Sequence, residues 1–331
     1  MPFGRDRSMP NTLPCFSAEE RVRAHELLGI RVAHMMGRKF EEGDWSYVYC
    51  RAKGIPEGGW SNLSIDVMHG NLGVEHKMLC YRSNASVVQA CGTSLMHPSA
   101  TRSIRVPSLD GDPNEVMAEV LQQYRDLIAE RARRVEGQSG VDAAADMRTG
   151  WLLWQESLHQ FLYFEERMAV PDTSDLYAEW VERATEGARR KGSKNLWIYE
   201  RSTGRKKYSV TTSAGAKIQP YFDVPPPGDP NLYLFTVIGE EILPGRVRVW
   251  LTAATARELG IVAGSTDVDR VSDLIIEACS ALGPGRVADD GRAELGVGVE
   301  VRSDAYNALV EALPGVSDEH CFVLLLEVLR S

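Results

Sequence analysis

Several features that define common protein classes are missing from this sequence. None of the six cysteines lies in a Cys-x-x-Cys pair, which argues against a zinc site or a disulfide framework. This cysteine pattern favours a protein of the reducing cell interior. No run approaches the roughly 18 apolar residues of a membrane span. No apolar run follows the first residues, as it would in a signal peptide. We therefore expect a cytoplasmic protein with no membrane partner.

Motifs for nucleotide binding and for serine hydrolysis are also missing. The glycine-containing stretches 283–285 and 295–298 match neither a Walker loop nor a dinucleotide fingerprint, so no nucleotide cofactor is indicated. No Gly-x-Ser-x-Gly elbow occurs, which argues against a serine hydrolase. Outside one central stretch, the histidines have no ligand spacing and no cysteine partner.

The composition is that of an ordinary globular protein. With 331 residues, 44% of them hydrophobic and 25% charged, the chain can form two domains or one domain with a large elaboration. The formal net charge of -9 argues against a protein that coats nucleic acid non-specifically, because such binding needs a broad excess of Lys and Arg. The charge is compatible with an enzyme that carries a local basic cleft on an acidic body.

The stretch from residue 65 to residue 79 lies in a predicted β-hairpin. One short apolar run covers residues 63–68, a turn follows at His69-Gly70-Asn71, and a second run covers residues 72–81. Apolar residues surround the charged ones in both runs, which predicts an interior hairpin in which charges seldom lie without a function.

Two acids and one lysine are expected on one face of this hairpin. Asp66 lies at the end of the first strand, and Glu75 and Lys77 lie on the second. Side chains alternate faces along a strand, so Glu75 and Lys77 point the same way and His76 points the other. Two carboxylates that converge form a hard-oxygen site of the kind that Mg²⁺ uses. A neighbouring lysine can orient the attacking water.

This pattern resembles the PD-(D/E)xK nuclease superfamily, in which an acid near a strand end is followed on the next strand by acid-any-lysine. The matching residues are Asp66, Glu75 and Lys77, with Ile65 where the family name has proline. The resemblance implies that Asp66 and Glu75 hold Mg²⁺, that His76 offers its backbone carbonyl to the metal, and that Lys77 positions the nucleophile. A structural alternative is that Glu75 and Lys77 are a solvated pair on a strand edge and Asp66 is a turn residue.

The family fold is an α/β fold, with a restriction-endonuclease-like αβββα core and a mixed sheet. We expect a flexible lead-in over 1–16, a nuclease core over 17–136, a helical region over 141–192 that forms core or a dimer interface, and an α/β region over 193–331 for DNA recognition. A capping pattern predicts a helix from Ser17 to about Phe40, and Glu26 on it is a candidate additional acid. The other predicted elements before residue 193 are strands over 45–50, 86–91 and 102–107 and helices over 114–135, 141–168 and 174–190.

The densest basic patch follows residue 188. A second hairpin is predicted over 195–211, where aromatic side chains lie beside Arg205, Lys206 and Lys207. The segment after it contains Lys217 and Gln219, which share a face if the chain is extended there. The functional interpretation of these residues is contact with DNA phosphates together with some stacking. The alternative is a solvated hairpin tip and a polar loop.

The sequence thus favours a Mg²⁺-dependent, site-specific DNA endonuclease of the restriction or defence type. The expected partner is double-stranded DNA, and a homodimer is expected because a symmetric pair can cut both strands. Two alternatives remain at this point. One is a noncatalytic nucleic-acid or protein-binding module, and the other is a repair or recombination nuclease of the same superfamily.

Overall fold

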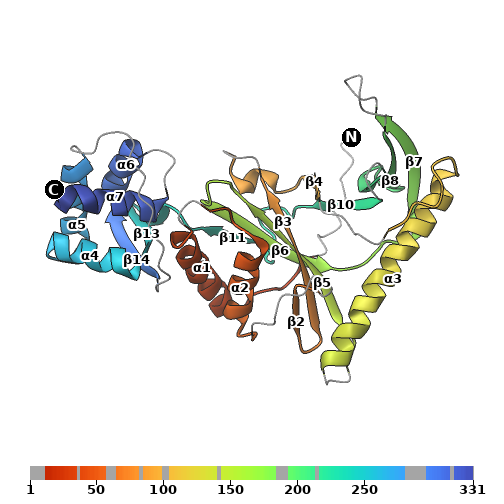
Figure 1. Cartoon of the computed structure of the whole chain (residues 1–331), viewed down its shortest axis with the longest axis horizontal. Helices are drawn as coiled ribbons and strands as arrows, with labels where there is room; N and C mark the ends of the chain where they lie inside the picture. Colours follow the sequence, from red (N-terminus) through yellow and green to blue (C-terminus); the bar gives the residue numbers. More distant parts are fainter. Residues whose placement is uncertain are drawn as a thin grey trace, which may run out of the picture.

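The computed structural model describes residues 12–35, 38–56, 65–81, 85–98, 104–139, 143–183, 193–212, 216–279, 296–313 and 317–330. Within these ranges the protein is an α/β structure with a mixed central sheet, a second antiparallel sheet and a C-terminal unit of three strands and four helices (Figure 1). None of the helices in these ranges has the length and apolarity needed to cross a bilayer.

Two helices open the described chain. The first is α1 (Ala18–Ala33), and its predicted start is confirmed because Ser17 and Glu20 form a reciprocal capping box. The second is α2 (Glu42–Lys53), where the sequence predicted a strand over 45–50. That prediction was wrong because the aromatic and β-branched side chains of this segment also have helical spacing. Trp45, Val48 and Tyr49 bury one helix face, and Gly54 ends the helix in the left-handed conformation.

The central sheet draws its strands from distant parts of the chain. Its order is β1-β6-β5-β3-β2, and β11 also pairs with β6. Strands β2 and β3 form the predicted antiparallel hairpin, whereas β3 and β5 are parallel and are connected through α3, which crosses between them. The bounds are β1 (Thr12–Leu13), β2 (Val67–His69), β3 (Leu72–Cys80), α3 (Pro113–Ser139), β5 (Asp146–Trp154), β6 (Gln160–Arg167) and β11 (Tyr233–Thr236).

The two helices predicted over 141–168 and 174–190 were wrong. The described parts of this region form β5, β6 and β7 (Leu176–Arg183), with a short 3-10 turn, η2 (Thr173–Asp175), before β7. Side chains on both faces of β5 and β6 are buried, so the apolar stripe of residues 151–168 is continuous rather than alternating. Periodicity cannot distinguish such a strand from a buried helix. The region over 141–192 is therefore not helical in its described residues, and β5 and β6 belong to the same sheet as β2 and β3.

A second sheet lies beside the first and has the order β4-β10-β9-β8-β7. The predicted hairpin over 195–211 is confirmed as β8 (Ser193–Glu200) and β9 (Lys206–Thr211). The N-terminal half of α3 packs on this sheet, and its C-terminal half reaches β2 and β3, as Figure 1 shows. The remaining strands are β4 (Ser94–Met96) and β10 (Lys217–Asp223). A 3-10 turn, η1 (Val87–Ala90), replaces the strand predicted over 86–91, and residues 104–107 form no strand either.

The C-terminal unit contains both strands and helices, as expected for the α/β region over 193–331. Three antiparallel strands form a sheet of order β12-β13-β14, and helices pack around it. Helix α1 also packs on β13, where Gly29 lies against the Trp250 ring so closely that a Cβ would be 2.6 Å from it. The bounds are β12 (Glu240–Leu243), β13 (Arg246–Thr252), α4 (Ala253–Ala263), α5 (Val268–Cys279), β14 (Gly296–Arg302), α6 (Ser303–Ala312) and α7 (Asp318–Arg330). The sequence patterns had not predicted α7.

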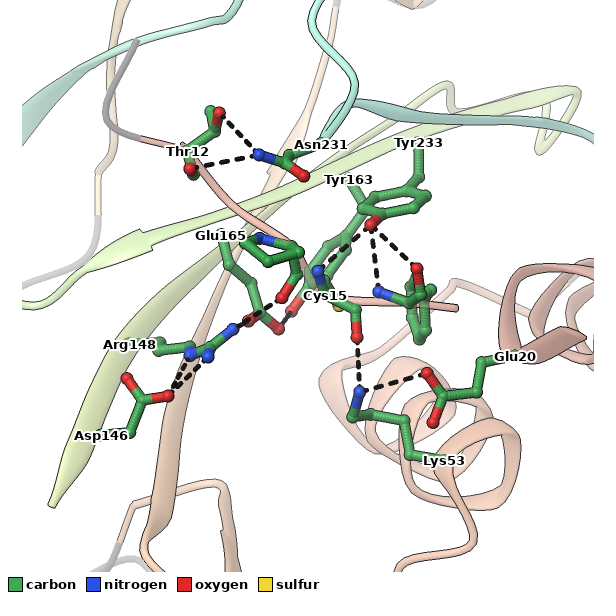
Figure 2. A network of polar contacts seen from close by, with 12 residues as sticks. Thr12, Cys15, Glu20, Lys53, Asp146, Arg148, Tyr163, Glu165, Asn231 and Tyr233 are labelled. Carbon is green, nitrogen blue, oxygen red and sulfur yellow. Dashed lines mark hydrogen bonds and ion pairs between the residues drawn. The ribbon is translucent and has the colours of Figure 1, made fainter. Parts of the chain in front are cut away.

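Residues 12–16 are not a flexible lead-in. β1 pairs with β6, and Cys15 and Phe16 are buried. The hydroxyl of Tyr233 accepts hydrogen bonds from both of their backbone N–H groups, at 3.1 and 3.0 Å (Figure 2). Lys53 donates to the Cys15 carbonyl. The prediction was wrong from residue 12 onward because it used proline content and could not include these distant partners. Residues 1–11 lie outside the described residues.

A buried ion pair fixes this corner of the central sheet. Glu165 on β6 is fully buried, and it accepts hydrogen bonds from Tyr163 at 2.8 Å and Arg148 at 3.1 Å. Arg148 also pairs with Asp146 and donates to the Pro14 carbonyl at 2.9 Å (Figure 2). Its neighbouring carboxylates raise the pKa of Arg148 despite its burial. One guanidinium therefore joins the N-terminal segment, β5 and β6.

Replacement of Arg148 should destabilise the protein strongly. Arg148→Met leaves Glu165 buried without its cation, so we expect the free energy of unfolding to fall by about 3–5 kcal/mol. The matched control is Arg134→Met, because the exposed Arg134–Glu130 pair on α3 should be worth only about 0.3–0.5 kcal/mol. Urea denaturation measures both values. Equal losses in the two variants would contradict the structural role of Arg148.

Candidate functional site

The predicted hairpin places Asp66 beside the second strand. Asp66 lies immediately before β2, and the turn contains Gly70 at φ 55°, a conformation that glycine adopts without strain. β2 pairs with β3 so that Val67 lies opposite Val74. The Asp66 side chain then reaches across, and its Oδ2 accepts a hydrogen bond from the His76 backbone N–H at 2.6 Å.

Glu75 lies between two cations. Its Oε1 is 2.7 Å from Lys77 Nζ, and its Oε2 is 3.1 Å from Arg131 Nη1 on α3. The side chains of Glu75, Lys77 and Arg131 are 12%, 24% and 25% exposed, so the cluster is largely shielded from water. The contact with Arg131 is an ion pair without hydrogen-bond alignment, because Glu75 Oε2 accepts no hydrogen bond from the described residues. The structure thus brings together all three predicted residues and adds Arg131.

The electrostatic environment of Asp66 opposes its ionisation. Burial, together with the negative charges of Glu75 and Glu42, raises the pKa of Asp66 to about 8, although the His76 N–H and Lys77 favour the ionised form. Glu42 is the first residue of α2. The structure therefore brings the charge of Glu42 close to the site. Glu26, the acid suggested from the sequence, is exposed on α1 and belongs to a different helix.

His76 lies on the opposite face of β3, as alternation predicts. Its ring is 2% exposed among Trp45, Tyr49 and Tyr163, with ring centroids at 6.4, 5.0 and 6.0 Å. Burial lowers the pKa of His76 to about 3, so the ring is neutral. Gly150 on β5 makes this packing possible, because a Cβ there would be 2.2 Å from the Tyr163 hydroxyl. The ring is thus a core side chain, and the predicted contribution of the His76 carbonyl stays a prediction.

The donor set of the two acids fits a hard divalent cation. Glu75 Oε2 accepts no hydrogen bond from the described residues, and the hydrogen bond that His76 donates to Asp66 uses Oδ2. Each acid thus retains an oxygen for a metal, and Mg²⁺ needs only one or two carboxylates when water and phosphate complete its shell. In the part of the chain that the structure describes, no group of three or more His, Cys, Asp or Glu side chains could hold a metal ion.

A polar cluster that sequence reasoning missed extends the site across the sheet. Glu166 on β6 accepts a hydrogen bond from Trp151 Nε1 at 2.8 Å, and burial raises its pKa while the charge of Lys207 opposes the rise. His97 contacts the Trp151 ring, and its Nε2 is 2.9 Å from the Met78 carbonyl. No local signal could have found these residues, because they come from segments far apart in the sequence.

The predicted basic residues have different environments. Lys207 and Arg205 pair with Asp223 at 3.2 and 3.5 Å, whereas Lys206 lies over the Trp197 ring. A bulge between Ile198 and Tyr199 shifts the register of β8 and β9 here. Lys217 and Gln219 lie on β10, where they share a face as predicted. Tyr208 is one of the aromatic side chains of the predicted hairpin, and it is buried on the face toward α3.

The raised pKa of Asp66 predicts a fall in stability with rising pH. The unfolded chain releases this proton near pH 4 and the folded chain near pH 8, so the unfolded state binds fewer protons between these values. We expect the unfolding free energy in EDTA to decrease across that window, and Asp66→Asn to reduce the decrease. Urea denaturation at several pH values measures it. The same pH dependence in Asp66→Asn as in the wild type would contradict the assignment.

Searches for similar proteins found no family model, no curated protein and no solved structure that matches this chain.

Proposed function

We propose that the protein is a Mg²⁺-dependent DNA endonuclease of the PD-(D/E)xK type. The observation that carries this proposal is the cluster of Asp66, Glu75 and Lys77 on one side of the β2–β3 hairpin. Two acids with oxygens available to a metal, and an ammonium beside one of them, are the groups that phosphodiester hydrolysis by this route requires.

The connectivity around the site supports the finer fold assignment. A hairpin carries the acids, α3 follows, and β5 returns parallel to the strand that carries Glu75 and Lys77. A helix acid near such a site is compatible with the same family, and the charge of Glu42 acts on Asp66. We propose that this part of the central sheet is a restriction-endonuclease-like core that shares its sheet with β6 and β11.

Each residue has a separate part in the proposed reaction. Asp66 and Glu75 hold the metal through their carboxylate oxygens. The metal, when bound, lowers the pKa of a coordinated water and neutralises charge on the phosphate. Lys77, whose Nζ is 2.7 Å from Glu75, orients the attacking water. Arg131 neutralises Glu75 from α3 and so limits the repulsion between the two acids. The products would carry a 5′-phosphate and a 3′-hydroxyl.

The proposed substrate is double-stranded DNA, cut at chosen sites by a homodimer in restriction or defence. A second candidate is a noncatalytic binding module, and the observation that favours it is the pairing of Glu75 with both Lys77 and Arg131. Ion pairs of this kind also occur as structural elements. A calorimetric titration with Mn²⁺ separates the two candidates, because the nuclease should release heat of metal binding that Glu75→Gln lacks, whereas the binding module should not respond.

Loss of any one of the three residues should abolish DNA cleavage. Asp66→Asn and Glu75→Gln remove charged metal ligands, and Lys77→Met removes the ammonium, so we expect single-turnover cleavage with Mg²⁺ to fall by about 10²-fold or more. DNA binding should remain. The matched control is Glu26→Gln, because Glu26 is an exposed acid on α1. This variant should cleave DNA at the wild-type rate. Near-normal cleavage by Asp66→Asn or Glu75→Gln would refute the site.

The basic strand should contribute to the salt dependence of DNA binding. If Arg205, Lys206 and Lys207 bind phosphates, their joint replacement by Ala should reduce the slope of log K against log salt by about 0.9 for each phosphate that is no longer neutralised. The matched control is the double Ala variant of Arg246 and Arg248 on β13, which share Glu300 as Arg205 and Lys207 share Asp223. Fluorescence anisotropy at several salt concentrations measures the slope. An unchanged slope in the triple variant would place the DNA elsewhere.

A further inference from the structure

Four aromatic side chains gather on one face of the second sheet. Tyr177 and Tyr199 on neighbouring strands are stacked, with ring centroids 5.1 Å apart and an interplanar angle of 17°. Trp197 lies two residues before Tyr199 on β8, so it shares that face. Burial and the neighbouring Glu179, Tyr177 and Tyr221 raise the pKa of Tyr199, which places Tyr221 in the same group. Strands β7, β8 and β10 thus present aromatic rings on one face of the sheet.

This face is the one that α3 does not cover. The alternate residues of the same strands, including Leu196 and Ile198, are fully buried against α3. Tyr177, Trp197, Tyr199 and Tyr221 are each only partly buried. In Figure 1, α3 runs along β7 and β8 on one side of the curved sheet. The four aromatic side chains therefore keep some exposed area on this face.

Cations lie among the rings. Lys206 Nζ is 2.9 Å from the centroid of the Trp197 ring, 5.7 Å from Tyr199 and 5.5 Å from Tyr221. Arg201 Cζ is 5.9 Å from the Tyr177 ring. Such cation–π contacts hold the positive groups at the level of the rings. Glu179 adds a negative charge beside Tyr199.

We propose that this aromatic face binds single-stranded nucleic acid by stacking unpaired bases on its rings, with Lys206 and Arg201 near the phosphates. Flat aromatic surfaces accept every base because each base has a π-face, and interspersed cations follow the backbone. A blunt duplex keeps its bases stacked inside and can offer only phosphates. The combination of rings and cations therefore favours a strand with exposed bases.

This inference rests on the proposed function, because it specifies the substrate of the proposed nuclease. It narrows the proposed double-stranded substrate to a duplex with an adjoining single-stranded part, such as a flap, an overhang or a junction. In this arrangement the Lys206 side chain contacts unpaired bases and phosphates. The charge of Lys207 instead lowers the pKa of Glu166, so Lys207 lies toward that acid.

The test measures binding in EDTA, where no cleavage takes place. A labelled oligothymidylate and a labelled blunt duplex are titrated with the full-length protein, and fluorescence anisotropy gives the two affinities. We expect Trp197→Ala to weaken binding of the single strand by roughly 5- to 150-fold, as loss of one base stack does, and to leave the duplex affinity within about twofold. Trp197→Phe should keep most of the affinity. Lys206→Met should reduce the salt slope for the single strand by about 0.7.

The matched control is Tyr47→Ala on α2, because Tyr47 also packs against two arginines but lies outside this face. The affinity of Tyr47→Ala for oligothymidylate should equal that of the wild type. Circular dichroism verifies that every variant is folded. Three results would overturn the proposal: no binding of oligothymidylate by the wild type, unchanged affinity in Trp197→Ala, or an equal loss for the blunt duplex. Because the assay needs neither Asp66 nor Glu75, its failure is distinct from failure of cleavage. Single-strand binding without cleavage would refute only the nuclease proposal.

Discussion

The pairing of β3 between β2 and β5 is the constraint on which both the fold and the candidate site depend. β3 pairs with β5 along its whole length and with β2 over its first three residues, so its side chains alternate between the two faces of the sheet. Val74 and His76 pack against α2, whereas Glu75 and Lys77 face α3. A slip of one residue would bury the charges among aromatic rings and expose the His76 ring to Arg131. The register and the charge arrangement therefore support each other.

Two charged clusters of the described residues, one around Glu165 and one around Asp66 and Glu75, differ in character. Both carboxylate oxygens of Glu165 accept hydrogen bonds, one from Tyr163 and one from Arg148. Glu165 therefore helps to hold the N-terminal segment through Arg148, and neither of its oxygens lacks a hydrogen-bond partner. Burial and the nearby charge of Glu75 raise the pKa of Asp66, and Glu75 keeps an oxygen that accepts no hydrogen bond from the described residues. Of these two clusters, the second is therefore the one in which a carboxylate oxygen without a hydrogen bond could bind a metal.

Local sequence predicted many elements but not the layers they form. The capping box at Ser17, the β2–β3 hairpin and the long α3 were predicted because their signals lie within a few residues. Helix α2 and strands β5 and β6 were assigned the wrong type. Strands buried on both faces lose the alternation that identifies a strand, and the aromatic residues of α2 resemble those of a strand.

The sequence by itself determined that Asp66, Glu75 and Lys77 share one environment, because a hairpin turn and period-two alternation are local properties. It also determined that Lys217 and Gln219 share a face. Only the tertiary structure decided that Arg131 pairs with Glu75, that Glu42 rather than Glu26 influences Asp66, and that Lys206 lies among aromatic rings. The Arg131–Glu75 pair depends on how α3 packs between two sheets, and the other two contacts join separate elements, so no short-range pattern encodes them.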